Sequence, residues 1–231
     1  MASTSPMLTI ERVQHACRAM ALDCTSDQAT QLLRYISEMQ KWNKTYNLTA
    51  LREPEKMLVQ HIFDSLSVVP YLSPLLANAP GSDQSTSRKL CDIGSGGGLP
   101  GVVIAVMTPH CAVQCIDAVE KKTAFVRQMV GAVGLPNLTA THSRVEQLPE
   151  QNADIVISRA FASLVDFATL SSKHVNSTGW LVGMKGKMPD DEIDALHAQT
   201  DWQVDHIDSL VVPELNAQRC LVWMRRKKGN P

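Results

Sequence analysis

The segment from Asp92 to Gly101, with the sequence DIGSGGGLPG, is the strongest indication of the fold in this chain. A short apolar run precedes the segment and a longer one follows, which is the order strand, turn, helix. Gly94, Gly96 and Gly98 have no Cβ, so the backbone can turn tightly there and approach a ligand closely. We therefore expect a ligand-binding turn at the carboxyl end of a strand.

A carboxylate follows this segment at a matching distance. Asp117 ends the next apolar run, 23 residues after Gly94. An acid about 20 residues beyond the first glycine accepts hydrogen bonds from ribose hydroxyls in nucleotide-binding folds. The two features together predict an adenosine-containing cofactor, because a tight turn that binds nothing rarely needs so many glycines and a matched acid.

Asp92 favours S-adenosylmethionine over a dinucleotide as this cofactor. The pyrophosphate of a dinucleotide is doubly negative and prefers a helix N-terminus without a nearby carboxylate. The methionine end of S-adenosylmethionine carries an ammonium and a sulfonium, so an acid two residues before the first glycine suits it better. The pattern D-x-G-x-G-x-G is thus the methyltransferase form of the glycine loop, and it argues against a nicotinamide-dependent oxidoreductase.

The bulk properties limit the partners and the location. The chain has 231 residues, of which 44% are hydrophobic and 19% charged, and this suits one globular domain with a small appendage. Its net charge of −1 indicates no general affinity for nucleic acid, so any RNA site must be a local basic patch. The N-terminus lacks a signal-peptide pattern, and the apolar runs fall far short of the ~20 residues that cross a bilayer. We expect a cytoplasmic monomer without membrane contact.

The cysteines give no sign of a metal site. They stand at positions 17, 24, 91, 111, 115 and 220, without a CxxC pair or a zinc-finger spacing to histidines. We therefore expect reduced, buried thiols and no bound metal, as is usual for a cytosolic protein.

The first part of the chain is predicted to be helical. Apolar residues recur at helical spacing over 26–42 and 54–69, with a weaker pattern over about 9–22, and Pro70 is expected to end the second helix. We expect a helical N-terminal extension at 1–77, a polar loop at 78–87, and a main domain at 88–231, all within one compact unit.

From residue 88 onward, strand patterns alternate with helical ones. Strands are expected at 89–93, 112–117, 137–141, 154–158 and 179–184. Helices are expected at 100–107, 119–133, 162–174 and 189–199. This alternation predicts a Rossmann-like α/β fold, a doubly wound parallel sheet with right-handed crossovers. Two β-rich runs at 202–212 and 218–224 predict a final antiparallel hairpin.

Six short motifs occur in an order that resembles a known family. They are Asn47-Leu48-Thr49, HIFDSL at 61–66, DIGSGGGLPG at 92–101, Ser143-Arg144-Val145-Glu146, SRAFA at 158–162, and Lys185-Gly186. From about residue 8 to 224, the chain is similar to the ribosomal RNA small subunit methyltransferase G family, also called the glucose-inhibited division protein B family. The resemblance implies a class I methyltransferase fold. It also implies S-adenosylmethionine-dependent methylation of N7 of a guanine in the decoding region of 16S rRNA, in the 30S subunit or an assembly intermediate of it.

The resemblance further implies which residues form the site. The implied cofactor-binding residues are Gly94, Gly96, Gly98, Leu99, Asp117, Val145, Glu146 and Arg159. Asp117 holds the ribose in this interpretation, and Val145 and Glu146 line the adenine pocket, although a capped helix start also explains that pair. Arg159 lies beside the methionine moiety and the incoming guanine, and it is the only residue we assign to catalysis. Its alternative role is a surface salt bridge.

The expected reaction needs no general acid or base. Amino-adenine methyltransferases carry a D/N-P-P-Y motif after the fourth strand, where this chain has SRAF at 158–161, and cytosine C5 methylation needs a cysteine nucleophile that is lacking there. Guanine N7 has an in-plane lone pair and no proton to remove, so alignment suffices. Phe161 can stack on the base or belong to the core. His61 and Asp64 are predicted to form a structural hydrogen-bond pair. The resemblance adds modest support for a role of this pair in covering the cofactor.

RNA binding requires positive charge near the mouth of the cofactor site. The candidates are Arg144, Lys121 and Lys185, with Lys122, Arg127, Lys187 and the basic tail at 225–228 as further positions. For the lysines and arginine after Asp117, a solvated helix face is an equal alternative. For the chain as a whole, the alternatives are a methyltransferase acting on another RNA, a small molecule or a protein, and a binding module without catalysis.

Overall fold

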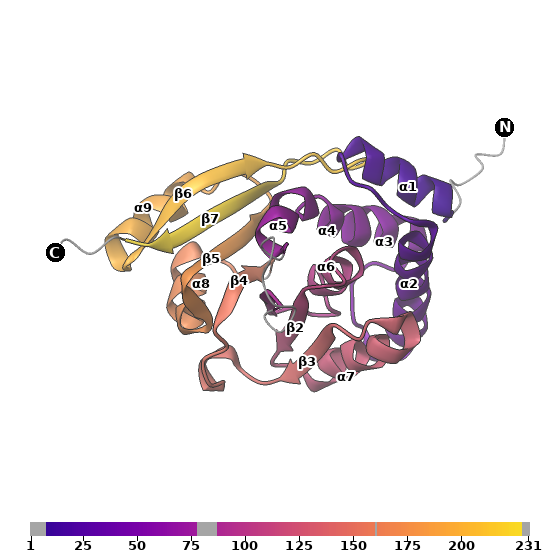
Figure 1. The fold of residues 1–231 in the computed structure, drawn as a ribbon, viewed down its shortest axis with the longest axis horizontal. Coiled ribbons are helices and arrows are strands. Elements are labelled where there is room, and N and C mark those ends of the chain that lie inside the picture. Colours follow the sequence, from indigo (N-terminus) through magenta and orange to yellow (C-terminus); the bar gives the residue numbers. More distant parts are fainter. Residues whose placement is uncertain (1–7, 78–86, 160, 228–231) are drawn as a thin grey trace.

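A seven-stranded mixed sheet with helices on both faces forms the centre of the molecule (Figure 1). The structure is a computed structural model that describes residues 8–77, 87–159 and 161–227. The strand order is β3-β2-β1-β4-β5-β7-β6, in which β1 to β5 run parallel and β7 lies antiparallel between β5 and β6. The strands are β1 (Lys89–Ile93), β2 (Ala112–Asp117), β3 (Leu138–His142), β4 (Ala153–Ser158), β5 (Val175–Lys185), β6 (Trp202–Ser209) and β7 (Cys220–Arg226). The predicted doubly wound sheet with a closing antiparallel hairpin is confirmed.

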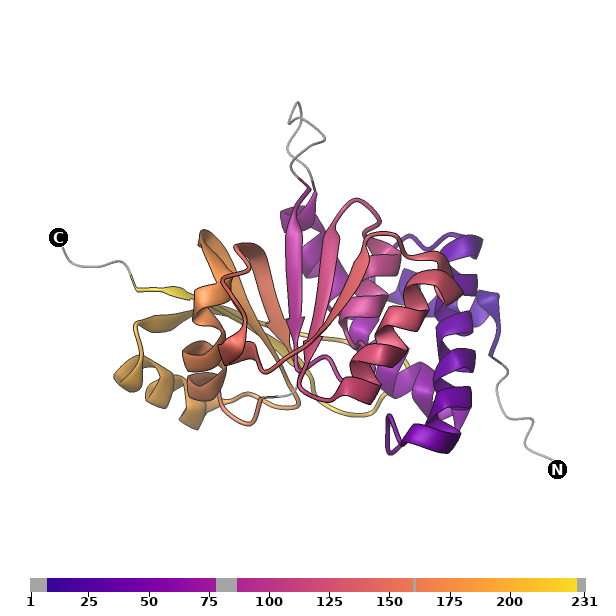
Figure 2. The same ribbon diagram turned by 90° about the horizontal axis from the view of Figure 1, so that it is seen from below.

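Two layers of helices cover the sheet (Figure 2). The helices are α1 (Ile10–Ala19), α2 (Ser26–Tyr46), α3 (Pro54–Met57), α4 (Asp64–Leu66), α5 (Val69–Leu76), α6 (Gly101–Met107), α7 (Glu120–Met129), α8 (Leu164–Ser171) and α9 (Asp190–Gln199). One apolar cluster joins the helices up to α7 to one face of the sheet, and a second joins α8 and α9 to the other face. In the described parts of the chain, no helix is both long and apolar enough to span a membrane.

The N-terminal helices share a core with the sheet. Leu32 and Met39 of α2 and Phe63 before α4 are fully or almost fully buried in the same cluster as Val102 and Ile104 of α6. A hydrogen-bonded capping box at Thr25 and Gln28 begins α2. This shared core fixes the helices preceding β1 against the glycine loop, and they therefore form one wall of the site described below.

The helix predicted over 54–69 is wrong in its details. The structure has α3, then a π-helical segment η1 (Leu58–Phe63), then α4, and the chain starts a new helix, α5, at Val69. Pro70 lies in the first turn of α5 rather than ending the helix before it. A proline is tolerated there because the first N–H groups of a helix have no partner within the helix. π-Helical turns often occur at functional sites, and η1 carries His61.

Two other predicted helices end in turns that are not α-helical. The helix expected over 119–133 ends as an α-helix at Met129 and continues as a π-helical turn, η2 (Val130–Gly134). The helix expected over 162–174 is α8 followed by a short 3₁₀ turn, η4 (Ser172–His174). The predicted loop at 78–87 lies outside the described residues except for its last position.

Candidate active site

The glycine loop joins β1 to α6 at the carboxyl end of the sheet. The amides of Gly94 and Ser95 donate to the carbonyl oxygen of Ile116 in β2, over 2.8 and 3.2 Å. The amide of Gly96 donates to Oδ2 of Asp117 over 2.8 Å. The loop is therefore tied to the end of the neighbouring strand, which brings the glycine motif and the predicted ribose-binding acid into direct contact.

Two glycines of the loop differ in what surrounds them. Gly96 has φ +59°, and a Cβ built on it meets no atom within 4 Å. Gly98 has φ +97°, and a Cβ there lies 2.6 Å from Cγ2 of Val102 and 3.0 Å from Cγ2 of Val126. Gly98 thus allows α6 and α7 to pack closely, whereas Gly96 keeps space open above the loop. Both were predicted to bind the cofactor.

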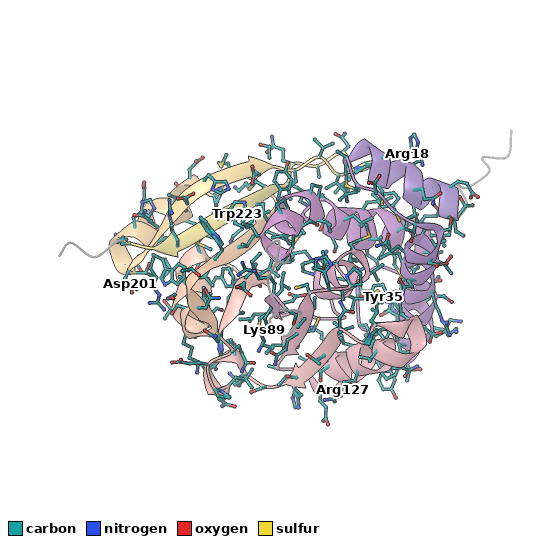
Figure 3. The ribbon with its side chains drawn as sticks, viewed as in Figure 1. Arg18, Tyr35, Lys89, Arg127, Asp201 and Trp223 are labelled. Atoms are coloured by element: carbon teal, nitrogen blue, oxygen red, sulfur yellow. The ribbon has the colours of Figure 1, made fainter. Side chains whose placement is uncertain are left out.

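Helix α2 supports the loop from outside the sheet. The hydroxyl of Tyr35 donates to the carbonyl oxygen of Gly97 over 2.7 Å, and this bond is buried. The side chain of Tyr35 extends from α2 toward the interior of the molecule (Figure 3). Met39, one turn further along, approaches the same glycine, since a Cβ on Gly97 would lie 3.1 Å from its terminal methyl. No sequence pattern indicates this contact, because Tyr35 fits equally well as an ordinary core residue.

Asp92, the acid that favoured S-adenosylmethionine in the sequence, lies beneath the glycine loop. Its side chain is fully buried beneath the loop, and Oδ2 accepts the amide of Gly101 over 2.7 Å. Oδ1 has no hydrogen-bond partner among the described residues. Burial raises the pKa of Asp92 to about 7, against a smaller lowering effect of the Gly101 hydrogen bond. The carboxylate therefore supports the start of α6 and does not face the cavities above the loop.

The first of three adjoining cavities lies over the ends of β1 and β2. Its volume is about 300 Å³, and its lining includes Gly94, Asp117, Val145, Glu146 and Phe161. The structure thus brings together the predicted ribose acid and the predicted adenine-pocket residues. Asp117 accepts the amides of Gly96 and Val119 on separate oxygens, over 2.8 and 2.9 Å. Each carboxylate oxygen has two lone pairs, so both retain capacity for a ribose hydroxyl.

The 3₁₀ turn η3 (Val145–Gln147) supplies another part of the wall of the first cavity. Val145 is buried and Glu146 is exposed. The ring of His174 lies 3.0 Å, through Nε2, from the carbonyl oxygen of Val145 and so anchors the turn. Phe161 stacks on Phe167 with ring centroids 5.1 Å apart, which fixes its ring at this cavity. The apolar faces and the carboxylate at one end match the two halves of an adenosine.

The second cavity lies over the glycine loop and has a volume of about 240 Å³. It shares Gly94 with the first cavity and is lined further by Gly96, Leu99, His61 and Arg159. Gly98 is in the lining of neither cavity. The open space above Gly96 belongs to this cavity, so a short polar chain can pass from the first cavity across the loop.

The third cavity is the largest of these, at about 460 Å³, and continues from the second through Thr49, His61 and Arg159. The rest of its lining is Ala50, Leu51, Gln60, Asp64, Met184, Lys185, Gly186 and Arg219. It lies between the N-terminal helical region, the end of β5 and the start of β7. A substrate group in this third cavity would adjoin the second cavity at these shared residues. We therefore call the third cavity the acceptor cavity.

An arginine pair on one buried carboxylate forms the charged part of the acceptor cavity. Oδ2 of Asp64 lies 3.1 Å from Nη1 of Arg159, and Oδ1 accepts Nε of Arg219 over 2.7 Å. The Asp64 side chain is only 4% exposed, whereas the arginines are 28% and 26% exposed. Arg159 therefore lies in the predicted crevice and forms a salt bridge at the same time, so its two alternative roles coincide.

Arg219 is a site residue that the sequence analysis missed. It lies just before β7, and the pairing of Lys185 with Cys220 places it beside the end of β5. Only the register of the hairpin brings it to the cavity. A lone arginine before a β-rich run carries no signal of that register.

His61 is neutral and bonded to Thr49 rather than to Asp64. Its Nδ1 lies 3.2 Å from the carbonyl oxygen of Gln60, and its Nε2 lies 2.9 Å from Oγ1 of Thr49. A carbonyl only accepts, so Nδ1 carries the hydrogen and Nε2 accepts the threonine hydroxyl. Burial lowers the pKa of His61 to about 4, and the charge of Arg159 adds to the shift. The predicted hydrogen bond between His61 and Asp64 is therefore wrong: in the described part of the chain, His61 bonds Thr49 and Gln60 instead.

The predicted RNA-binding residues have unequal surroundings. Lys185 is largely buried, and its Nζ lies 2.7 Å from Oε2 of Glu192 and 3.3 Å from the carbonyl oxygen of Phe161. Its charge is therefore already compensated, although it lines the acceptor cavity. Arg144 is 69% exposed at the rim of the first cavity, 3.8 Å from Glu146. Lys121 is exposed in the first turn of α7 and lines none of the three cavities.

The other described basic candidates line none of the three cavities. Arg127 is exposed on α7 at the periphery of the molecule (Figure 3). Arg225 forms a salt bridge with Asp205, and Arg226 lies 3.4 Å from Asp201. The last basic residue of the predicted tail, at 228, lies outside the described residues.

Comparisons with known proteins agree with this geometry. The family model of rRNA small subunit methyltransferase G matches residues 28–222. The ribosomal RNA small subunit methyltransferase G of Bordetella pertussis is 60% identical over 220 residues, which cover 95% of this chain and 94% of the relative. That of Leptothrix cholodnii is 47% identical over 209 residues, which cover 90% and 92%. A SAM-dependent methyltransferase from Aquifex aeolicus is similar in structure, with a TM-score of 0.54, 14% identity, and coverage of 77% of this chain and 96% of that chain. The last likeness shows the fold alone.

Proposed function

Because the chain belongs to the rRNA small subunit methyltransferase G family, we propose that it methylates N7 of a guanine in the decoding region of 16S rRNA, with S-adenosylmethionine as the cofactor. The observation that carries the proposal is the run of three cavities, joined through shared lining residues, from Asp117 to Arg219. S-adenosylmethionine supplies the transferable methyl group when it is bound.

The residues of the first two cavities fit this cofactor. Asp117 receives the ribose hydroxyls, and Val145 with Phe161 covers the adenine ring, while Glu146 lies at its edge. Gly94, Gly96 and Leu99 form the floor for the methionine part of the cofactor. Arg159 binds the carboxylate of that methionine part. Gly98 acts indirectly, by holding α6 in place beneath the loop.

The acceptor cavity suits a nucleophile that needs no deprotonation. His61, which lines both the second cavity and the acceptor cavity, is neutral and has its Nε2 lone pair directed at the Thr49 hydroxyl. N7 of guanine has a free in-plane lone pair, so the protein's task is to hold the base and to exclude water. The arginines in the cavity donate hydrogen bonds, which suits guanine O6 and phosphate oxygens.

We further propose that Arg144 at the rim contacts the RNA backbone, since it is exposed next to the first cavity. Lys121 adds positive charge on the adjoining helix start, and Lys185 contributes chiefly by fixing the wall of the acceptor cavity. We infer a monomer acting in the cytoplasm. The free state of all six cysteines is compatible with a reducing compartment.

The test is transfer of a labelled methyl group to 16S rRNA and to 30S subunits from cells lacking this protein, with the product mapped by cleavage at 7-methylguanosine. We expect one labelled guanine in the decoding region. Arg159→Ala should lose most of this activity, and the control Arg88→Ala, which removes an arginine paired with Asp154 away from the cavities, should retain it. Label that enters only another RNA, a small molecule or a protein contradicts the proposal.

A further inference from the structure

The buried carboxylate of Asp64 is the feature of the acceptor cavity that the proposed reaction leaves unexplained. A negative charge in a cavity meant for RNA opposes binding of phosphates when only net charge matters. Asp64 is nevertheless 4% exposed, and both its oxygens are bonded to guanidinium groups. Its place in the cavity therefore calls for a role other than charge attraction.

We propose that Asp64 is a positioning residue, which acts on the RNA acceptor by holding Arg159 and Arg219 in fixed orientations. This inference rests on the proposed function. Asp64 touches neither cofactor nor substrate in this role. It bonds Nη1 of Arg159 and Nε of Arg219, and so directs the remaining donors of both guanidinium groups from opposite sides of one carboxylate.

The two arginines come from distant parts of the chain, which makes a common anchor necessary. Arg159 follows β4, and Arg219 precedes β7. Without the carboxylate, two like charges next to each other repel and their long side chains regain rotamer freedom. Asp64 itself is fixed because its residue lies in the buried helical segment that follows η1. The anchor is thus more rigid than either arginine.

A second contact holds the β6–β7 loop in the same way. Arg12 of α1 forms salt bridges with Glu55 of α3, over 2.5 Å, and with Glu214 of the loop, over 2.7 Å. The loop reaches across to α1 in Figure 1. Salt bridges at Arg12 and at Asp64 therefore both attach the loop that carries Arg219 to the N-terminal helices, and of these two Asp64 lines the acceptor cavity.

Of the two arginines, Arg219 is the one whose substitution should affect the acceptor without affecting the cofactor. Arg159 lines both the second cavity and the acceptor cavity, whereas Arg219 lines the acceptor cavity and neither of the other two. Arg219→Gln should therefore raise the KM for the ribosomal substrate about tenfold, as expected for loss of one oriented arginine, and leave the Kd for S-adenosylmethionine near its wild-type value.

The decisive variant is Asp64→Asn, because the two explanations predict opposite signs. Removing one negative charge should tighten RNA binding if net charge alone decides. Positioning predicts the reverse, a KM for the ribosomal substrate raised about tenfold. In an Arg219→Gln background the same Asp64→Asn change should cost less than it does alone, because one of the two groups it orients is already gone.

Asp154→Asn is the matched control. Asp154 also bonds an arginine, since its Oδ1 lies 2.7 Å from Nη1 of Arg88, but it stands at the amino end of β4. We expect its KM to stay within about twofold of wild type. Melting temperatures of all variants show whether they are folded, and Arg219→Gln decides the matter if Asp64→Asn does not fold.

The outcomes separate the two proposals. Wild-type protein that methylates no ribosomal substrate overturns the proposed function and this inference with it. Active wild-type protein, together with a folded Asp64→Asn variant whose KM is unchanged or lower, overturns the positioning role alone. So does an unchanged KM in Arg219→Gln. A raised KM in both variants, with additivity lost in the double variant, supports it.

Discussion

Two alanine substitutions in the glycine loop should affect different properties of the protein, although both replace a glycine with positive φ. In Gly98→Ala the new methyl overlaps Val102 and Val126, at 2.6 and 3.0 Å. In Gly96→Ala the methyl meets no protein atom within 4 Å and enters the second cavity instead. We therefore predict that Gly98→Ala chiefly lowers stability and that Gly96→Ala chiefly lowers cofactor affinity.

The magnitudes follow from the two surroundings. A left-handed backbone costs a non-glycine residue about 1–2 kcal/mol, and this applies to both variants. Overpacking against the valines adds about 1–3 kcal/mol to Gly98→Ala only. We expect the free energy of unfolding to fall by about 1–2 kcal/mol in Gly96→Ala and by about 2–5 kcal/mol in Gly98→Ala. In Gly96→Ala the new methyl overlaps the bound cofactor instead. If this overlap costs about as much as the overpacking in Gly98→Ala, the affinity for the cofactor falls about tenfold or more.

The assay pairs urea denaturation with calorimetric titration of S-adenosylmethionine on the same preparations. The midpoint of unfolding should be lower for Gly98→Ala than for Gly96→Ala, and the Kd should be higher for Gly96→Ala. Equal loss of stability in both variants refutes the packing argument for Gly98. An unchanged Kd in Gly96→Ala refutes the assignment of the second cavity to the cofactor.

Two further predictions concern buried polar groups. Tyr35→Phe leaves the Gly97 carbonyl oxygen without its 2.7 Å donor, so the free energy of unfolding should fall by about 1–3 kcal/mol, and Tyr46→Phe, which is exposed, should show no such loss in the same denaturation experiment. Asp92 has a folded pKa of about 7, above its ordinary value, so the folded state binds the proton more tightly and wild-type stability falls as pH rises from about 4 to about 7. Asp92→Asn lacks this slope, and it should gain roughly 4 kcal/mol relative to wild type across that range, measured by unfolding at several pH values. A parallel pH dependence in both proteins contradicts the buried, raised-pKa carboxyl.

The alternation of strands and helices was readable from the sequence because apolar runs in a parallel sheet are short, continuous and separated by helical patterns. Errors arose where local chemistry has two solutions. Pro70 ends one helix and begins another equally well, and the packing of α5 decides between them. The π-helical turn η1 has no sequence signature of its own.

Within the site, the residues that were predictable lie close together along the chain or at the ends of adjacent parallel strands. The glycine loop, Asp117 and the turn at Val145 meet because parallel strands end at the same edge of the sheet. That the cofactor contains adenosine was likewise predictable from the glycine loop and Asp117, which line one cavity.

Which side chains face the site, and whether their charges are compensated, depends on how separate elements pack together. Asp92 lies beneath the loop rather than in the cavity, and Lys185 is compensated by Glu192. The contact of Asp64 with Arg219 joins residues that are 155 positions apart and depends on the register of an antiparallel hairpin. Such contacts have no local periodicity, because they arise only when separate elements are packed around one core.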